Sequence, residues 1–388
     1  MELTHGGDRP THSWHLGKPF GSIEGDVAAL LREERFDAVA RLADLARERQ
    51  VDAVIVAGDV FDSSTVPDQV IRRALEVMRA YSGPWVLLPG NHDPALAESP
   101  WTRLHRFGLP ENVLPAVVRE PLVLADGRLA VLPSPPTRRH EPDDITEWMD
   151  DCQTPDDAAR IGLAHGNVAG RAPEGDAHNQ ISNARATRAR LRYFALGDWH
   201  GTREIGPATW YSGTPACDRF RNNDSGNALI VTIEAPRAPP RVERIVVGRY
   251  DWRECIVTCG VGGDADPVAV VETAIGAAAG VAPDRTLLRL VLKGTATLAA
   301  HKRIEDCLGT WRARLRYLEE DLDELIDEPS ADDLDDLDRG GFVRTAIDRL
   351  AAKGGTCSTL NPNSPERPFG CFILSTWQRG AERCVFAV

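Results

Sequence analysis

Apolar positions in the first part of the chain follow two spacings in turn. Over residues 27–46 they recur three and four positions apart, and the segment VDAVIVAGD at 51–59 is then a short continuous apolar run that ends at a glycine. The same order returns in PDQVIRRALEVMRAY at 67–81 and PWVLLPGNHD at 84–93. Each pair of segments predicts an amphipathic helix followed by a buried strand.

Two further apolar runs end in the same way. They are IGLAHGN at 161–167 and YFALGDWHG at 193–201. Alternation of helices and buried strands predicts a layered α/β domain whose functional loops follow the carboxyl ends of the strands.

The pattern changes after residue 230. NALIVTIE at 227–234 and RVERIVV at 241–247 flank a proline-rich turn, which predicts a hairpin. Strand-like and helical segments then alternate from 254 to 326 and predict a small α/β unit. We therefore expect a first domain over 1–235, a capping domain over 236–330, and a segment over 331–388 with an acidic linker, one helix at 342–353 and a tail of unknown role.

The composition is that of an ordinary globular protein. The 388 residues are 42% hydrophobic and 27% charged, and no apolar run approaches the length of a membrane span, about 20 residues. The first residues have neither a basic start nor an apolar stretch, so we expect no secretory signal and a cytoplasmic location. Eight cysteines without a Cys-x-x-Cys pair argue against a zinc ribbon and a disulfide scaffold.

The net charge of −13 does not exclude a nucleic-acid partner. Residues 319–338 hold twelve acids and no Lys or Arg, and removing these twelve charges from −13 leaves −1 for the rest of the chain. Basic residues cluster at Arg138 and Arg139 and in the run Arg185, Arg188, Arg190 and Arg192. The run is compatible with a solvated helix face or with a phosphate-contacting surface. The acidic stretch after residue 326 lacks the glycine of a calcium loop, so it predicts a solvated connector.

Polar side chains gather at the ends of the predicted strands. The sequence places there Asp59, Asp62, Asn91, His92, Asp93, His165, Asp198 and His200. Four strand ends in succession that each present Asp, Asn or His are hard to explain as turns alone. Imidazole, carboxylate and amide oxygen together suit a pair of Mn, Fe or Zn ions that activates a water and binds a phosphoryl group.

The motifs GDVFD, GNHD, AHGN and the late W-H resemble the core motifs of the calcineurin-like metallophosphoesterases. WHLGKPFG at 14–21 and TWYSGTPACDRF at 209–220 are similar to segments of the bacterial SbcD-type DNA repair exonucleases, over about residues 10 to 330. The resemblance implies a β-sandwich flanked by helices in α/β/β/α layers, a small α/β capping domain and a C-terminal helical tail. It also implies a metal-dependent DNA exonuclease or endonuclease.

The resemblance also implies roles for the polar residues. Asp59 would bridge two divalent ions, with Mn²⁺ the first choice and Mg²⁺, Fe²⁺ or Zn²⁺ as alternatives. The first ion would add His15 and His200, and the second would add Asn91, His165 and Asp198. His92 would touch the scissile phosphate or protonate the leaving oxygen, and Asp93 would hold the imidazole in place. Asp62 would contact the metal ligands without binding an ion itself.

Two positions depart from the family pattern. Asp198 stands where the family has a histidine, and a carboxylate there favours harder ions. Ser13 stands where the family has an aspartate two residues before the histidine of the first motif. Asp8 and His12 do not have the spacing of a replacement ligand, so we expect the first ion to be weakly held.

The expected partners are DNA and an SMC-like ATPase that binds the C-terminal region; a homodimer is also compatible with the resemblance, and no membrane is expected. Two other functions stay open. One is a phosphatase or small-molecule phosphodiesterase with the same core, against which the long segment after YSGTP counts. The other is a weakly active or non-catalytic DNA-binding protein, which Ser13 suggests.

Overall fold

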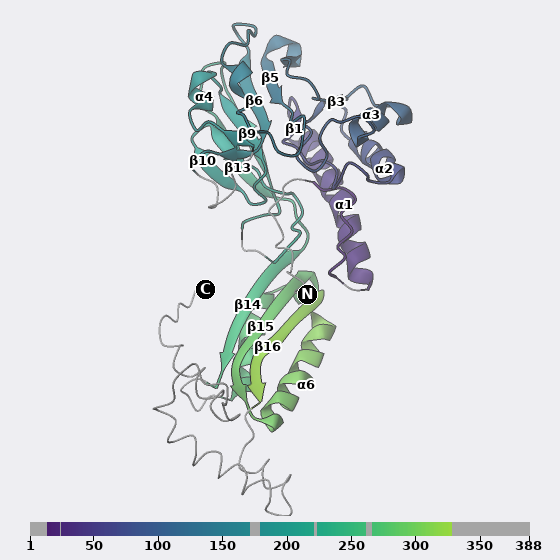
Figure 1. The fold of residues 1–388 in the computed structure, drawn as a ribbon, viewed down its shortest axis with the longest axis vertical. Helices are drawn as coiled ribbons and strands as arrows, with labels where there is room; N and C mark the ends of the chain where they lie inside the picture. The colour runs from purple at the N-terminus through teal and green to yellow at the C-terminus, as the bar shows by residue number, and fades with distance from the viewer. Residues whose placement is uncertain (1–13, 24, 171–178, 221–222, 261–265, 328–388) are drawn as a thin grey trace, which may run out of the picture. The chain divides into compact units, whose positions relative to one another are not determined.

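The computed structural model describes residues 14–23, 25–170, 179–220, 223–260 and 266–327 (Figure 1). These fall into two compact units. The first takes the described residues of Met1–Cys255, Ala277–Arg289 and Arg312–Glu319, and the second takes those of Ile256–Gly276, Leu290–Trp311 and Glu320–Val388. Several sequence predictions lie outside the described residues: Asp8, His12 and Ser13, the acidic stretch beyond Asp327, the helix at 342–353 and the tail.

The first unit contains two sheets. The smaller is parallel and consists of β1 (Val54–Val56), β2 (Trp85–Leu87) and β3 (Val113–Pro115). The larger has the order β10-β11-β9-β6-β5-β4, from β4 (Leu122–Leu124), β5 (Leu129–Ser134), β6 (Ala159–His165), β9 (Tyr193–Gly197), β10 (Arg203–Gly206) and β11 (Thr209–Tyr211). Strands β5, β6 and β9 are parallel, so the loops that follow them start at the same edge of the sheet.

The sheets and helices of this unit stack in layers. Helices α1 (Asp26–Glu48) and α2 (Asp68–Met78) cover the outer face of the small sheet (Figure 1). Their apolar side chains Phe36, Val39, Ile71 and Leu75 share one buried cluster with Val56 and Trp85 of the strands. A second cluster lies between the sheets and joins Val86 and Leu88 to Val131 and Leu163. A third covers the outer face of the large sheet and joins Leu132 and Phe194 to Met149 and Ala189. The predicted α/β/β/α fold is confirmed.

Short elements complete the first unit: α3 (Pro100–Leu104), β7 (Asn167–Val168), β8 (Gln180–Ile181), α4 (Arg185–Arg188) and single 3₁₀ turns at His105–Phe107, Ala125–Gly127, Glu147–Met149 and Pro283–Arg285.

The first residue of the basic run, Arg185 in α4, fits neither of the two interpretations of the run, a solvated helix face or a phosphate-contacting surface. The Arg185 side chain is buried and lies 2.8 Å from Asp144 and 2.6 Å from Asp150, and Arg188 also pairs with Asp150 at 2.9 Å. Arg185 therefore neither belongs to a solvated face nor contacts phosphate, because its charge is neutralised inside the fold.

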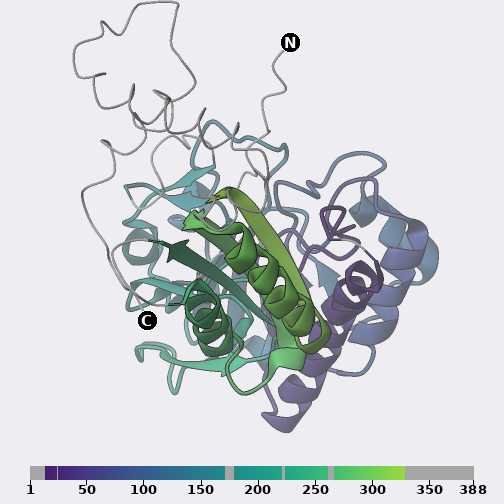
Figure 2. The ribbon, with the colours of Figure 1, turned by 90° about the horizontal axis from the view of Figure 1, so that it is seen from below.

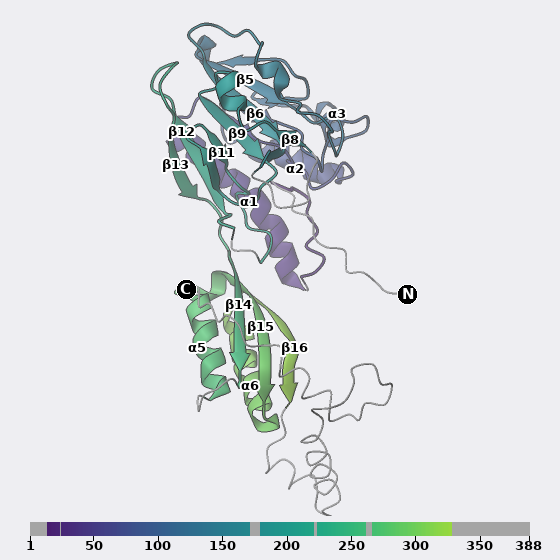
Figure 3. The ribbon, with the colours of Figure 1, turned by 60° about the vertical axis from the view of Figure 1, so that its left-hand side comes forward.

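The hairpin predicted near residue 235 is present. Strands β12 (Asn227–Thr232) and β13 (Arg241–Val246) pair in antiparallel order, and the predicted boundary at 235 falls in the connection between them. Strands β14 (Asp251–Cys259), β15 (Thr286–Ala296) and β16 (Tyr317–Asp327) then form a three-stranded sheet. Helices α5 (Pro267–Ala279) and α6 (Leu298–Arg314) lie on one side of it (Figures 2 and 3). Our division into domains stays a prediction.

Among the residues that the structure describes, no helix combines the length and the apolar character needed to cross a membrane.

Candidate metal centre

Strained backbone marks three of the predicted ligands. The φ angles of His15, Asp59 and Asp198 are 43°, 47° and 102°. Residues other than glycine in this region cost about 1–3 kcal/mol each, and such residues concentrate at functional sites. The three residues come from segments far apart in the sequence, so their shared strain indicates that tertiary contacts hold them in place.

Two glycines let the strand ends come close together. Gly58 has φ 99°, and a Cβ there would lie 2.1 Å from His165 Nδ1. A Cβ on Gly90 would lie 2.1 Å from Asp59 Oδ1. The glycines in the GD and GN motifs are therefore required by close approach of side chains to the backbone.

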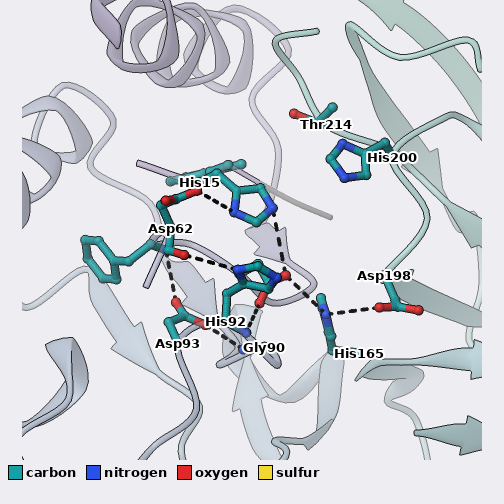
Figure 4. A network of polar contacts seen from close by, with 12 residues as sticks. His15, Asp62, Gly90, His92, Asp93, His165, Asp198, His200 and Thr214 are labelled. Atoms are coloured by element: carbon teal, nitrogen blue, oxygen red, sulfur yellow. Dashed lines mark hydrogen bonds and ion pairs between the residues drawn. The ribbon is translucent and has the colours of Figure 1, made fainter. Parts of the chain in front are cut away.

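Asp59 lies between His15 and His165, both of which are labelled in Figure 4. Its side chain is fully buried, and Oδ2 lies 3.4 Å from His165 Nε2 and 3.9 Å from His15 Nε2. Its other oxygen, Oδ1, accepts a hydrogen bond of 2.8 Å from the backbone N–H of His92. The carboxylate thus faces imidazoles on two sides, as a ligand shared between two ions would.

The orientation of His165 is the observation that best fits a metal ion. Its Nδ1 lies 2.8 Å from the carbonyl oxygen of Ala57, which can only accept, so Nδ1 carries the proton of the neutral imidazole. Nε2 then presents a lone pair to Asp59 Oδ2 at 3.4 Å and to Asp198 Oδ1 at 3.8 Å. Burial lowers the pKa of His165, which keeps the ring neutral. A lone pair that faces two carboxylates is unfavourable unless a cation lies between them.

Asn91 is the fourth ligand that the sequence predicts for this second position. Its Oδ1 is buried and has no hydrogen-bond partner among the described residues. As they stand, no three described His, Cys, Asp or Glu side chains close tightly enough to form a finished metal site. Ligands bound to one ion at about 2.1 Å are about 3–3.5 Å apart, so the measured 3.4–3.8 Å needs only a small contraction. After such a contraction His165, Asp59 and Asp198 would hold a divalent cation, with Asn91 as the amide ligand that the sequence predicts.

The first position is built from two stacked imidazoles. The rings of His15 and His200 are nearly parallel, with centroids 5.9 Å apart. A carboxylate lies beside Nδ1 of each ring: Asp62 Oδ1 at 3.3 Å from His15 and Asp218 Oδ1 at 2.9 Å from His200. Burial lowers the pKa of both rings to about 4, so each is neutral near pH 7 and its Nε2 can act as a ligand.

Asp218 is a candidate site residue that our sequence reasoning missed. It is buried, and besides His200 its carboxylate lies 2.7 Å from Lys18 and 3.4 Å from Arg35. Burial by itself would raise the pKa of Asp218, but His200, Lys18 and Arg35 hold this pKa well below its usual value. The residue is part of TWYSGTPACDRF, yet it lies after β11 in a loop without periodicity, so only its contacts identify it.

Replacing Asp218 with Asn should weaken metal binding at the first position. The amide keeps the shape but loses the charge that orients His200 Nδ1, and losses of this kind cost about 10 to 100-fold in metal affinity or activity. Calorimetric titration with Mn²⁺ measures the effect. Asp224→Asn is the matched control, because Asp224 is exposed and pairs with Arg244. Equal Mn²⁺ affinity in both variants would show that Asp218 is merely structural.

The contacts of His92 and Asp93 correct one predicted role. The Asp93 carboxylate accepts hydrogen bonds from the backbone N–H groups of Phe61 at 3.0 Å and Gly90 at 2.7 Å. His92 Nδ1 instead lies 3.1 Å from the carbonyl oxygen of Asp62. Asp93 thus joins the loops after β1 and β2, and the carbonyl of Asp62, not the Asp93 side chain, holds the imidazole. Burial and the charge of Asp59 raise the pKa of Asp93 well above its usual value.

Residues 11–200, just under half of the chain, match the family model of the calcineurin-like phosphoesterases. Members of this family are phosphoester hydrolases that use divalent metal ions. Among curated proteins, the chain is similar to the D subunit of nuclease SbcCD from Bacillus subtilis (strain 168), with 28% identity over 291 residues, 64% of this chain and 69% of the relative. It is also similar to the uncharacterized metallophosphoesterase YhaO of the same organism, with 26% identity over 56% of this chain and 55% of that protein.

Proposed function

We propose that this chain is a metal-dependent nuclease that hydrolyses phosphodiester bonds in DNA. The observation that carries the proposal is His165 Nε2, an unprotonated nitrogen that faces Asp59 at 3.4 Å and Asp198 at 3.8 Å. The similarity to one subunit of a bacterial nuclease supports DNA as the substrate. A DNA substrate also agrees with the cytoplasmic location expected from the sequence.

Two divalent ions, with Mn²⁺ first, fit the donor set because it mixes imidazole with oxygen and contains no thiolate. His15, Asp59 and His200 would hold the first, and Asp59, Asn91, His165 and Asp198 the second. When bound, such ions polarise the phosphoryl oxygens and lower the pKa of water, so that a nucleophile is available near neutral pH.

The remaining residues of the site position groups and move a proton. His92 Nδ1 is held by the Asp62 carbonyl, so Nε2, which is buried and has no hydrogen-bond partner among the described residues, is the nitrogen that can contact the phosphate or the leaving oxygen. Asp93 connects two backbone N–H groups and so fixes the loops that carry Asp59 and Asn91.

We further propose that the chain works as the nuclease component of a complex with an SMC-like ATPase, bound through the C-terminal region, which lies outside the described residues. The first relative is by its name one part of a multi-subunit nuclease, which supports an assembly of this kind. A homodimer is compatible with the same assembly. Size-exclusion chromatography of the full chain with and without such an ATPase tests both associations.

Activity should require a divalent ion. We expect Mn²⁺ to stimulate cleavage of linear duplex DNA and a chelator to abolish it, since the site offers oxygen and imidazole ligands around Asp59. Elemental analysis of the purified chain, followed by cleavage assays before and after dialysis against EDTA, measures the dependence. Undiminished cleavage in EDTA after dialysis would rule out the two-metal site.

The same assays separate the alternatives. A phosphatase or small-molecule phosphodiesterase would hydrolyse a chromogenic phosphoester and leave linear DNA intact. A non-catalytic DNA-binding protein would bind DNA and cleave neither substrate. Cleavage of DNA that depends on Mn²⁺ supports the nuclease.

A further inference from the structure

The loop after β5 begins beside the candidate metal centre. Strand β5 ends at Ser134, which pairs with Ala164 in β6, the residue before His165. Since parallel strands end at the same edge of a sheet, residues that follow Ser134 start next to the loop that follows His165. This loop carries the Arg138–Arg139 pair noted in the sequence.

Hydrogen bonds hold this loop in one conformation. The backbone N–H of Glu141 donates to Asn179 Oδ1 at 2.6 Å, and the N–H of Asn179 donates to the carbonyl oxygen of Glu141 at 3.1 Å. Asn179 in turn accepts a 2.9 Å bond from the N–H of Asn167, two residues after His165. The loop is thereby attached to the segment that carries a metal ligand, so it forms a preorganised surface at the site.

Arg139 is the cation that this surface leaves available. Arg138 lies 3.4 Å from Glu141 Oε2, whereas the other oxygen of Glu141 accepts a 2.8 Å bond from Thr137 Oγ1. Both oxygens of the Glu141 carboxylate therefore already have partners. Within the described part of the chain, the exposed Arg139 guanidinium forms no ion pair, while its backbone oxygen accepts a 3.1 Å bond from Asn179 Nδ2.

The positive charge of Arg139 also acts on a residue of the candidate metal centre. Arg139 lies close enough to His92 for its positive charge to act on that imidazole. A guanidinium near the imidazole is well placed for an anionic substrate, because its planar donors match two phosphate oxygens.

We propose that Arg139 binds a phosphate of the DNA strand next to the scissile phosphate and so positions the strand over the metal centre. The inference rests on the proposed nuclease function and adds a positioning residue to it. The scissile phosphate itself would bind at the metal ions around Asp59, whereas Arg139 lies on the neighbouring loop.

Binding of duplex DNA at several salt concentrations tests the proposal without requiring cleavage. Arg139→Gln should raise the Kd by about 10-fold at low salt and reduce the slope of log K against log [salt] by about 0.9, the value for one phosphate contact. Arg139→Lys, which keeps the charge, should retain most of the slope. Hydrolysis of a small chromogenic phosphodiester should fall less than cleavage of DNA in Arg139→Gln.

Arg128→Gln is the matched control. Arg128 is exposed and pairs with Asp52 at 3.0 Å just before β5, at the other end of a strand of six residues, about 20 Å long. The salt slope of Arg128→Gln should equal that of the unmodified chain, and melting temperatures check that all variants fold.

An unmodified chain that binds DNA, together with an Arg139→Gln variant of equal salt slope, would overturn the inference and leave the proposed function intact. An equal loss on DNA and on the small phosphodiester would also overturn it, since Arg139 would then act on the scissile phosphate. If the unmodified chain neither binds nor cleaves DNA, the proposed function fails and the inference fails with it.

Discussion

Replacing His92 with Ala is expected to lower the turnover of DNA cleavage by about 10²-fold or more, the usual effect of a lost general acid. Metal content and DNA binding should stay largely unchanged. His92 Nδ1 lies 3.1 Å from the carbonyl oxygen of Asp62, whereas Nε2 has no hydrogen-bond partner among the described residues and can contact substrate. The ring is neutral near pH 7, because burial lowers the pKa of His92 to about 4. An approaching phosphate stabilises the protonated ring and raises this pKa, which prepares Nε2 to deliver a proton.

The measurement compares single-turnover cleavage rates, Mn²⁺ content and DNA affinity in the variant and in the unmodified chain. His105→Ala is the control, since His105 is an exposed residue of a 3₁₀ turn in the same unit. Loss of Mn²⁺ from the His92 variant would show that His92 is a ligand, and our assignment of its role would then be wrong.

Replacing Ser13 with Asp is expected to raise the affinity of the first metal position by about 10 to 100-fold and to raise the cleavage rate with it. In the unmodified chain the ligands proposed for that position are His15, Asp59 and His200, of which only Asp59 is anionic. Nearby positive charge further disfavours a cation at this position. The Asp218 carboxylate beside His200 is shared with Lys18, Arg35 and Arg219. We therefore expect the second position to fill first and the first position to stay weak or empty.

Titration with Mn²⁺, followed by calorimetry or elemental analysis, gives the stoichiometry and affinity for each variant. Ser13→Asn is the matched control, since the amide has nearly the shape of the carboxylate without its charge. Two fully bound ions and rapid cleavage in the unmodified chain would contradict the prediction and would point to Asp8, His12 or a water as the missing ligand.

Periodicity was sufficient to predict most of the fold. The segment with helical spacing over 27–46 lies in α1, and the apolar runs at 51–59 and 84–93 contain β1 and β2. These elements could be predicted because the spacing of apolar residues indicates which face of an element is buried. The hairpin of β12 and β13 followed from two strand patterns around a proline-rich turn. The membership of the buried clusters and the pairing of β5 with β6 and of β6 with β9 could not be predicted in this way, since they depend on contacts between distant segments.

The sequence by itself determined which side chains follow the strands, and so the chemical types available at the site: imidazole, carboxylate and amide. Only the tertiary structure decided what each does. The carbonyl of Ala57 selects the tautomer of His165, Asp218 rather than a residue near in sequence orients His200, and Asp93 binds backbone N–H groups instead of His92. Arg185 and Arg139 look alike in the sequence, yet one is neutralised inside the fold and the other is exposed beside the site. The physical reason is that tautomers, ion pairs and burial depend on distances between groups that the chain brings together only when it folds.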